Sequence, residues 1–251
     1  MRLRGYALSL ALSLASPATL ALRPYDGTDA AVAPPREFEI ELGPVGRLRE
    51  GDRTSRVAPA LIVNYGLSSD RELVIQGQRE VANDPEPGQA RSSIVENGIF
   101  VKQVLKAGVL QDRPGLSMAT EYGVLLPGVH DQHGTGVSVA AIVSQRTEAF
   151  TAHLNGALAL NRDHEPGVFL GVIVEGPYAW RIRPVAEIFG DKASGSSGVT
   201  SGLVGAIWRA SDNLAFDLGV RAARAGSESI RELRLGLTWS FELADAPRRT
   251  P

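Results

Sequence analysis

Hydrophobic and polar residues alternate along most of the chain. In the stretch "ELRLGLTWSFEL" (232–243) one parity is apolar: Leu233, Leu235, Leu237, Trp239 and Phe241. The other parity begins with Glu232 and Arg234 and is polar or small. Successive side chains of a β-strand point to opposite faces, so this segment predicts a strand with one apolar and one polar face. The apolar face must meet either a protein core or lipid.

The same alternation recurs and predicts about twelve strands. We place them near 37–43, 57–67, 71–80, 93–106, 116–126, 136–146, 149–161, 167–175, 179–189, 199–209, 213–224 and 229–242. Most are close to the roughly 9–11 residues that cross a bilayer at a tilt. No segment has the pattern of an amphipathic helix, and no apolar run after residue 25 approaches the roughly 18 residues of a spanning helix.

The predicted connections differ on the two sides of this strand series. After even-numbered strands they are mostly short, as in "LSSD", "QRTEA", "EGPYA" and "RASDN", with a longer "AGVLQDRPG". After odd-numbered strands they include the longer, polar "VGRLREGDRTSR", "VANDPEPGQARS", "PGVHDQHGT" and "GDKASGSSG". Short turns on one side and long loops on the other are typical of outer-membrane barrels. An even strand number places both termini on the short-turn, periplasmic side.

We therefore predict an all-β, antiparallel, up-and-down transmembrane β-barrel over residues 37–243. The alternative is a secreted soluble sandwich or barrel, whose strands alternate too. The regular charged parity across so many strands favours the membrane barrel. In the eleventh strand we expect Leu214, Phe216, Leu218 and Val220 to face lipid, with Asp217 and Arg221 pointing into the barrel.

The N-terminus has the layout of a secretory signal peptide over residues 1–21. Arg2 and Arg4 precede an apolar stretch, and Thr19 and Ala21 form a plausible cleavage site. An N-terminal anchor or a buried helix is the alternative. Export together with a transmembrane barrel predicts that the protein lies in the outer membrane of a Gram-negative-type bacterium. Residues 22–36 are turn-rich and predict an extended N-terminal segment, and residues 244–251 predict a C-terminal tail.

Composition removes several kinds of chemistry. The chain has no cysteine, which excludes disulfides, thiolate metal sites and cysteine nucleophiles. The formal net charge is −2, and loss of the two signal-peptide arginines makes the exported chain more acidic. There is no basic block, so we expect no nucleic-acid partner.

The final strand resembles the C-terminal assembly signal of outer-membrane barrels on three residues, Gly236, Trp239 and Phe241. The resemblance implies that the barrel-assembly machinery pairs with this strand, as strand addition permits. It departs from the signal in one respect, because "ELADAPRRTP" follows the last aromatic residue. Trp239 and Phe241 also suit the aromatic girdle at the outer-membrane lipid interface.

Most of the mature chain resembles the family of outer-membrane transporters associated with meta-pathway phenol degradation. The residues that carry the resemblance are "EYGVLLPG" (121–128), "AHLNGAL" (152–158), "RPVAEIFG" (183–190) and "SGLVGAIWRASDNLAFDLGVRAA" (201–223). The resemblance implies a barrel and suggests transport. It supplies no solute and no functional residues.

If the apolar parity faces lipid, the polar parity lines the lumen. The lumen-lining candidates are Glu39, Glu41, Glu72, Gln76, Glu96, Glu121, Arg146, His153, Asn155, Glu175, Arg181, Arg183, Glu187, Arg209, Asp217, Arg221, Glu232 and Arg234. Acids crowd the early strands and arginines the late ones. This predicts either a constriction that selects small polar or anionic-headed solutes, or an internal salt-bridge network that closes the barrel. Twelve strands fall between barrels filled by side chains and barrels with open channels.

Catalytic interpretations are weaker. His153 and Asn155 share a face, but no G-x-S-x-G turn supplies a serine nucleophile. The loop residues His130, Asp131 and His133 are better explained as a solvated loop than as a metal site. We predict no catalytic, metal or cofactor site and expect a passive channel for small molecules. A non-conducting structural or envelope-anchoring barrel is the alternative. A barrel lipid hydrolase is a weaker one, which requires a serine beside His153.

Overall fold

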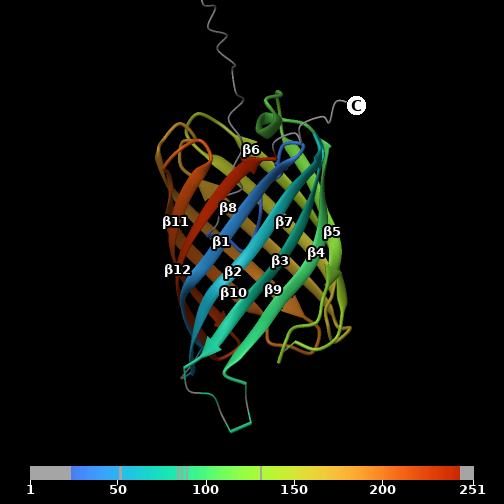
Figure 1. Ribbon diagram of the computed structural model, residues 1–251, viewed down its shortest axis with the longest axis vertical. Helices are drawn as coiled ribbons and strands as arrows, with labels where there is room; N and C mark the ends of the chain where they lie inside the picture. Colours follow the sequence, from blue (N-terminus) through green and yellow to red (C-terminus); the bar gives the residue numbers. More distant parts are fainter. Residues whose placement is uncertain are drawn as a thin grey trace, which may run out of the picture.

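The computed structural model describes residues 24–243 except 51, 52, 84, 86, 89 and 131. The predicted signal peptide and C-terminal tail lie outside the described residues. Twelve antiparallel strands form a closed barrel in which each strand pairs with its sequence neighbours and β1 pairs with β12 (Figure 1). The strands are β1 (Glu37–Glu50), β2 (Arg53–Ser68), β3 (Arg71–Ala82), β4 (Ser92–Lys106), β5 (Ser117–Leu125), β6 (Gly136–Arg146), β7 (Thr151–Leu160), β8 (Pro166–Glu175), β9 (Ile182–Ala193), β10 (Val199–Arg209), β11 (Leu214–Ala225) and β12 (Glu228–Glu242).

The predicted strand number and topology are confirmed, and a two-sheet sandwich is excluded by the closure of the barrel. β1 begins and β12 ends at the same end of the barrel, which we call the termini end and which is uppermost in Figure 1. The Leu243 amide donates to the Arg36 carbonyl there, at 3.2 Å. The opposite end, which we call the loop end, carries the β3–β4 and β5–β6 connections.

Loop lengths are less asymmetric than predicted. The expected polar loop "VGRLREGDRTSR" is mostly strand, because β1 continues to Glu50 and β2 begins at Arg53. β9 likewise runs past the expected loop start to Ala193, because Asp191 pairs with Val199 of β10 and Lys192 with Val168 of β8. It begins at Ile182 rather than near 179. At the termini end, the β4–β5 connection holds a short 3₁₀ helix, η1 (Val109–Gln111).

The barrel is apolar outside and polar inside. Along β11, Leu218 and Val220 are exposed on the outer surface, whereas Asp217 is 8% exposed and Arg221 points inward to Glu232. Buried polar side chains from most strands share the interior with apolar clusters, one of which includes Ile173, Leu203 and Ile207, while valine, leucine and isoleucine cover the exterior. This is the arrangement that a lipid-facing strand requires. No helix of the described residues is both long enough and apolar enough to cross a membrane.

Aromatic side chains gather near the termini end. Phe38 lies 4.7 Å from Tyr65 and 5.7 Å from Phe241, between ring centroids, and Trp239 lies 4.6 Å from Phe241. Trp208 and Phe216 form a further pair at 5.6 Å. Such rings suit a membrane interface. Trp239 is exposed on the outer surface, whereas Gly236 lies on the inward parity, where an added Cβ would overlap the Asp217 carboxylate.

Candidate functional site: a lumen crossed by the N-terminal segment

Residues Pro24–Pro35, which we call the luminal segment, cross the inside of the barrel. The amides of Asp26 and Gly27 donate to the Glu187 carboxylate of β9 at 2.9 and 2.8 Å. The Thr28 amide donates to Asn155 Oδ1 of β7 at 3.0 Å, and Asn155 Nδ2 donates back to the Thr28 carbonyl at 2.9 Å. Side chains of the barrel wall therefore provide the hydrogen-bond partners that the backbone of the luminal segment would find in a neighbouring strand if it were part of a sheet.

The segment then reaches the opposite wall. The Ala30 amide donates to Ser144 Oγ of β6 at 3.0 Å, and the Ala33 amide donates to Glu72 Oε2 of β3 at 2.6 Å. Pro35 pairs with Gly66 of β2, where any larger residue would overlap the Pro34 carbonyl. The segment thus enters beside β9 and β12 and leaves beside β2 and β3.

One wall of the lumen is rich in arginine. We define the arginine wall as Arg183 of β9, Arg221 of β11 and Arg234 of β12. Arg234 donates to the Pro24 carbonyl at 2.7 Å and to both Asp26 carboxylate oxygens at 3.0 and 3.1 Å. Arg221 also approaches Asp26, at 3.7 Å. The luminal segment is therefore fixed to this wall by opposite charge.

The same arginines pair with acids of their own strand or of a neighbouring one. Glu232 lies 2.9 Å from Arg234 and 3.2 Å from Arg221, and Glu175 lies 3.4 Å from Arg183. These ion pairs lie along one wall and do not cross the lumen. The luminal segment lies between the acids of the early strands and the arginines of the late ones.

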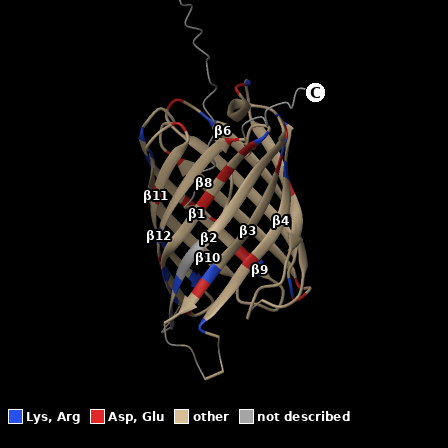
Figure 2. Ribbon diagram, viewed as in Figure 1, with Lys and Arg blue, Asp and Glu red and all other residues tan. Residues whose placement is uncertain are grey.

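The other wall is rich in acids. We define the acidic wall as Glu39 and Glu41 of β1, Glu72 of β3 and Glu121 of β5. Figure 2 shows acidic positions in the upper half of β1. Lys102 of β4 lies 3.3 Å from Glu72 and donates to Thr28 Oγ1 at 3.0 Å. Asn64 Nδ2 donates to Glu41 at 2.9 Å.

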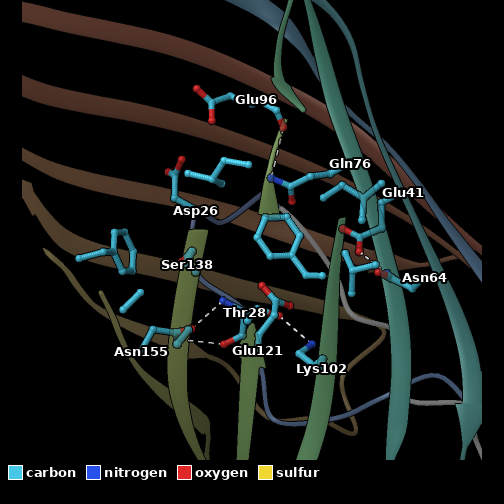
Figure 3. Close-up of a pocket in the computed structure, with 18 residues that line it drawn as sticks. Asp26, Thr28, Glu41, Asn64, Gln76, Glu96, Lys102, Glu121, Ser138 and Asn155 are labelled. Carbon is cyan, nitrogen blue, oxygen red and sulfur yellow. Dashed lines mark hydrogen bonds between the residues drawn. The ribbon is translucent and has the colours of Figure 1, made fainter. Parts of the chain in front are cut away.

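A cavity of about 330 Å³ opens between the acidic wall and the luminal segment (Figure 3). Asp26, Gly27 and Thr28 line its inner end, and Leu125, Ser138 and Phe169 line it where β5, β6 and β8 approach the loop end. Its charged lining comprises four acids and one base: Asp26, Glu41, Glu96, Glu121 and Lys102. Its volume lies within the range of small-molecule pockets. We call it the vestibule.

Ser144, His153 and Glu175 form a row on β6, β7 and β8. Ser144 Oγ lies 2.8 Å from His153 Nδ1, and His153 Nε2 lies 3.5 Å from Glu175 Oε1. This supplies the serine that the hydrolase alternative required. However, Ser144 is 0% exposed, and its Oγ is already bound by the Ala30 amide. The row therefore holds the luminal segment and offers no access to a substrate.

The predicted lumen-lining residues occupy three kinds of place. Arg181 and Arg209 lie at the termini-end rim, where Arg181 donates to the carbonyls of Arg209 and Ala210. Arg146, the last residue of β6, also lies at the termini end, where it stacks on the Tyr178 ring at 3.8 Å. Glu96 lies near the loop end beside Gln132. The remaining candidates point inward: Glu39, Glu41, Glu72, Gln76, Glu121, His153, Asn155, Glu175, Arg183, Glu187, Asp217, Arg221, Glu232 and Arg234.

Sequence reasoning missed Lys102, Ser144 and the luminal position of residues 24–35. Lys102 falls on the inward parity of its strand, so alternation could have found it. Among the described residues, no group of three His, Cys, Asp or Glu side chains is placed to hold a metal ion. Asp131 of the "HDQH" loop lies outside them.

Comparison with known proteins supports the fold. No family model matches the sequence, and no curated protein matches it. The COG4313 outer membrane channel from Pseudomonas putida F1 is similar in structure, with a TM-score of 0.58 and 11% identity over 87% of this chain and 100% of that one. The KdgM porin has a TM-score of 0.55 and 11% identity over 81% of this chain and 99% of that one. The chain therefore has the fold of outer-membrane channel barrels.

Proposed function

We propose that the protein is an outer-membrane channel for small solutes, with the luminal segment setting what passes. The observation that carries the proposal is a closed barrel with an apolar exterior and buried polar side chains inside, whose vestibule ends at a segment held by hydrogen bonds, ion pairs and the apolar packing of Tyr25. The channel barrels that share the fold support it. One of them, the KdgM porin, has been solved in complex with disordered oligogalacturonate, which illustrates a solute within such a fold.

The vestibule favours cations. Four of its five charged residues are acids. Arg234 pairs with Asp26 and Arg162 pairs with Glu96, so the cation preference comes mainly from the carboxylates of Glu41 and Glu121, and a cluster of carboxylates selects for cations in a pore. The apolar side chains of Phe100 and Phe169 add surface for an organic body. We therefore propose small cationic or neutral polar solutes. This keeps the small polar solutes expected from the sequence and replaces the anionic-headed ones with cationic ones.

The membrane orientation follows from the same proposal. The termini end faces the periplasm, because β1 begins and β12 ends there, and the vestibule faces outward. Assembly through the final strand, with Trp239 and Phe241 in lipid, remains part of the proposal. So does removal of residues 1–21 on export.

Solute flux in proteoliposomes tests the proposal. Wild-type protein should pass monovalent cations and small neutral solutes, with a steep loss of flux as solute size rises. Planar-bilayer recordings under a salt gradient should give a reversal potential whose sign shows that cations pass more readily than anions. Absence of any flux from correctly folded protein would contradict the proposal.

A non-conducting barrel is the second candidate, because the luminal segment crosses the interior and much of the wall is ion-paired. The flux measurement separates the two. The hydrolase candidate is tested by a fluorophosphonate probe. We expect no labelling of Ser144 in folded protein, because its Oγ is buried beneath Ala30.

A further inference from the structure

The outer surface of the barrel differs between its two sides at the loop end. On β4 to β8 the outward residues there are apolar: Ile94, Val124, Val137, Leu160 and Val168. On the five consecutive strands β11, β12, β1, β2 and β3 the exposed residues include six arginines. We call these the outer arginine patch: Arg47, Arg49, Arg56, Arg79, Arg224 and Arg231. Figure 2 shows basic residues toward the lower, loop-end parts of the strands.

A bulge in β1 directs two of these arginines outward. The register against β12 shifts between Leu42 and Val45, so that Leu42 faces Leu237 and Val45 faces Leu235. Before the bulge, Glu39 and Glu41 are buried in the lumen; after it, Arg47 and Arg49 are exposed. Uninterrupted alternation would have put the arginines on the same inward face as the glutamates.

The patch brings like charges directly together. Arg47 is the cross-strand partner of Arg56, and Arg49 is the cross-strand partner of Arg231. Like charges directly opposite one another destabilise a sheet. The other cross-strand neighbours of the six are leucine, valine, isoleucine, alanine, serine or threonine, and none is acidic. An anion shared between the guanidinium groups of Arg47 and Arg56 would remove the repulsion within that pair.

The height of the patch matches a lipid headgroup. Arg231 and Trp239 lie on β12 eight residues apart, with Trp239 at the aromatic termini end. At about 3.4 Å per residue and a tilt of about 40°, the two differ by about 20 Å along the barrel axis. The apolar band of such barrels is about 25 Å tall, so Arg231 lies near the opposite interface. Phosphates of membrane lipids are found at that depth.

We propose that the outer arginine patch binds the phosphates of an anionic lipid in the leaflet at the loop end, a lipid whose headgroup carries more than one phosphate. Guanidinium groups bind phosphate oxygens through paired hydrogen bonds, and several arginines spread over five strands match a headgroup with several anions. The inference rests on the outer-membrane placement of the proposed function but not on solute flux.

Lipid retention measured by native mass spectrometry tests it. Wild-type protein and the variants R47Q/R56Q and R49Q/R231Q are placed in phosphatidylcholine nanodiscs that contain a minor fraction of diphosphoryl lipid A. We expect wild type to retain the phosphorylated lipid at least tenfold more often than either double variant. K192Q is the matched control, since Lys192 is also exposed near the loop end of β9 but lies outside the patch, and it should retain lipid as wild type does.

Equal retention by wild type and both double variants would overturn the proposal. Displacement of the retained lipid by inorganic phosphate would also overturn it, because the site would then bind free phosphate rather than a membrane lipid. If a glutamine variant fails to fold, R47K/R56K keeps the charge, and a folded lysine variant should retain intermediate amounts of lipid. Solute flux should be unchanged in all these variants, so a failure here is distinct from a failure of the channel proposal.

Discussion

The two walls of the lumen hold the same segment in different ways. At the arginine wall, Arg234 and Arg221 bind the Asp26 carboxylate by charge, and Arg234 also binds the Pro24 carbonyl. At the acidic wall, the Ala33 amide donates to Glu72 and Lys102 donates to Thr28, while the ion pair of Lys102 with Asp29 is longer, at 4.0 Å; the vestibule opens beside these contacts. The difference suggests that the arginine wall anchors the segment, whereas the acidic wall shapes the path that solutes take.

The largest expected effect tests whether the arginine wall points inward at all. Leu218→Arg places a charge on the outer surface of β11 in mid-barrel, at a cost of roughly 2–4 kcal/mol if that surface meets lipid. We expect a sharp loss of folded, membrane-inserted protein, measured by heat-modifiable gel migration. Arg221→Ala, three residues away but inside, is the control and should insert normally. Normal insertion of Leu218→Arg together with failure of Arg221→Leu would reverse the assignment.

The next prediction compares an arginine that binds the luminal segment with one that pairs only with the barrel wall. Arg234→Ala removes the bonds to Pro24 and Asp26 and leaves both Asp26 and Glu232 without that partner. Arg234 is buried whereas Asp26 is partly exposed, so loss of this ion pair and of the bond to Pro24 should loosen the segment, and single-channel conductance should rise severalfold. Arg183→Ala breaks only a pair within the wall, with Glu175, and should change conductance far less. Equal conductance in the two variants would show that Arg234 does not anchor the segment more strongly than Arg183 does.

Much of the barrel is predictable from local pattern, whereas its contents are not. Alternation in β11 identifies Asp217 and Arg221 as inward, because side-chain direction repeats every two residues. The luminal segment has no such period. Its partners Glu187, Asn155 and Glu72 lie far away in sequence and are brought together only by closure of the barrel. The outward direction of Arg47 could not be predicted from the alternation either, because the bulge before Val45 reverses it.

A smaller effect is expected from a neutral contact in the middle of the lumen. Asn155→Leu removes both hydrogen bonds to Thr28 and leaves polar backbone groups unsatisfied, at about 1–3 kcal/mol each. We expect a moderate rise in conductance and more frequent opening events. Asn64→Leu is the matched control, because Asn64 bonds Glu41 on the wall. The same rise in both variants would mean that general loss of polar contacts, not release of the segment, changes conductance.

The smallest effect concerns the acidic wall. Glu121→Gln removes one of the four acids that line the vestibule while leaving the barrel wall intact. Cation preference, measured as the reversal potential in a salt gradient, should fall modestly, with little change in conductance. Glu228→Gln, at the exposed start of β12, is the control and should leave the reversal potential unchanged. A shift toward stronger cation preference would contradict the assignment of the acidic wall.

The most direct test is to lock the luminal segment in place. The chain has no cysteine, so the double variant Gly27→Cys/Asn155→Cys contains only the two introduced thiols. A Cβ at Gly27 would lie 3.2 Å from Asn155 Cγ, close enough for a disulfide between the segment and β7. We expect low, invariant conductance when the pair is oxidised and a reversible rise on reduction, with no redox response in either single variant. Identical conductance before and after reduction would show that the luminal segment does not control passage.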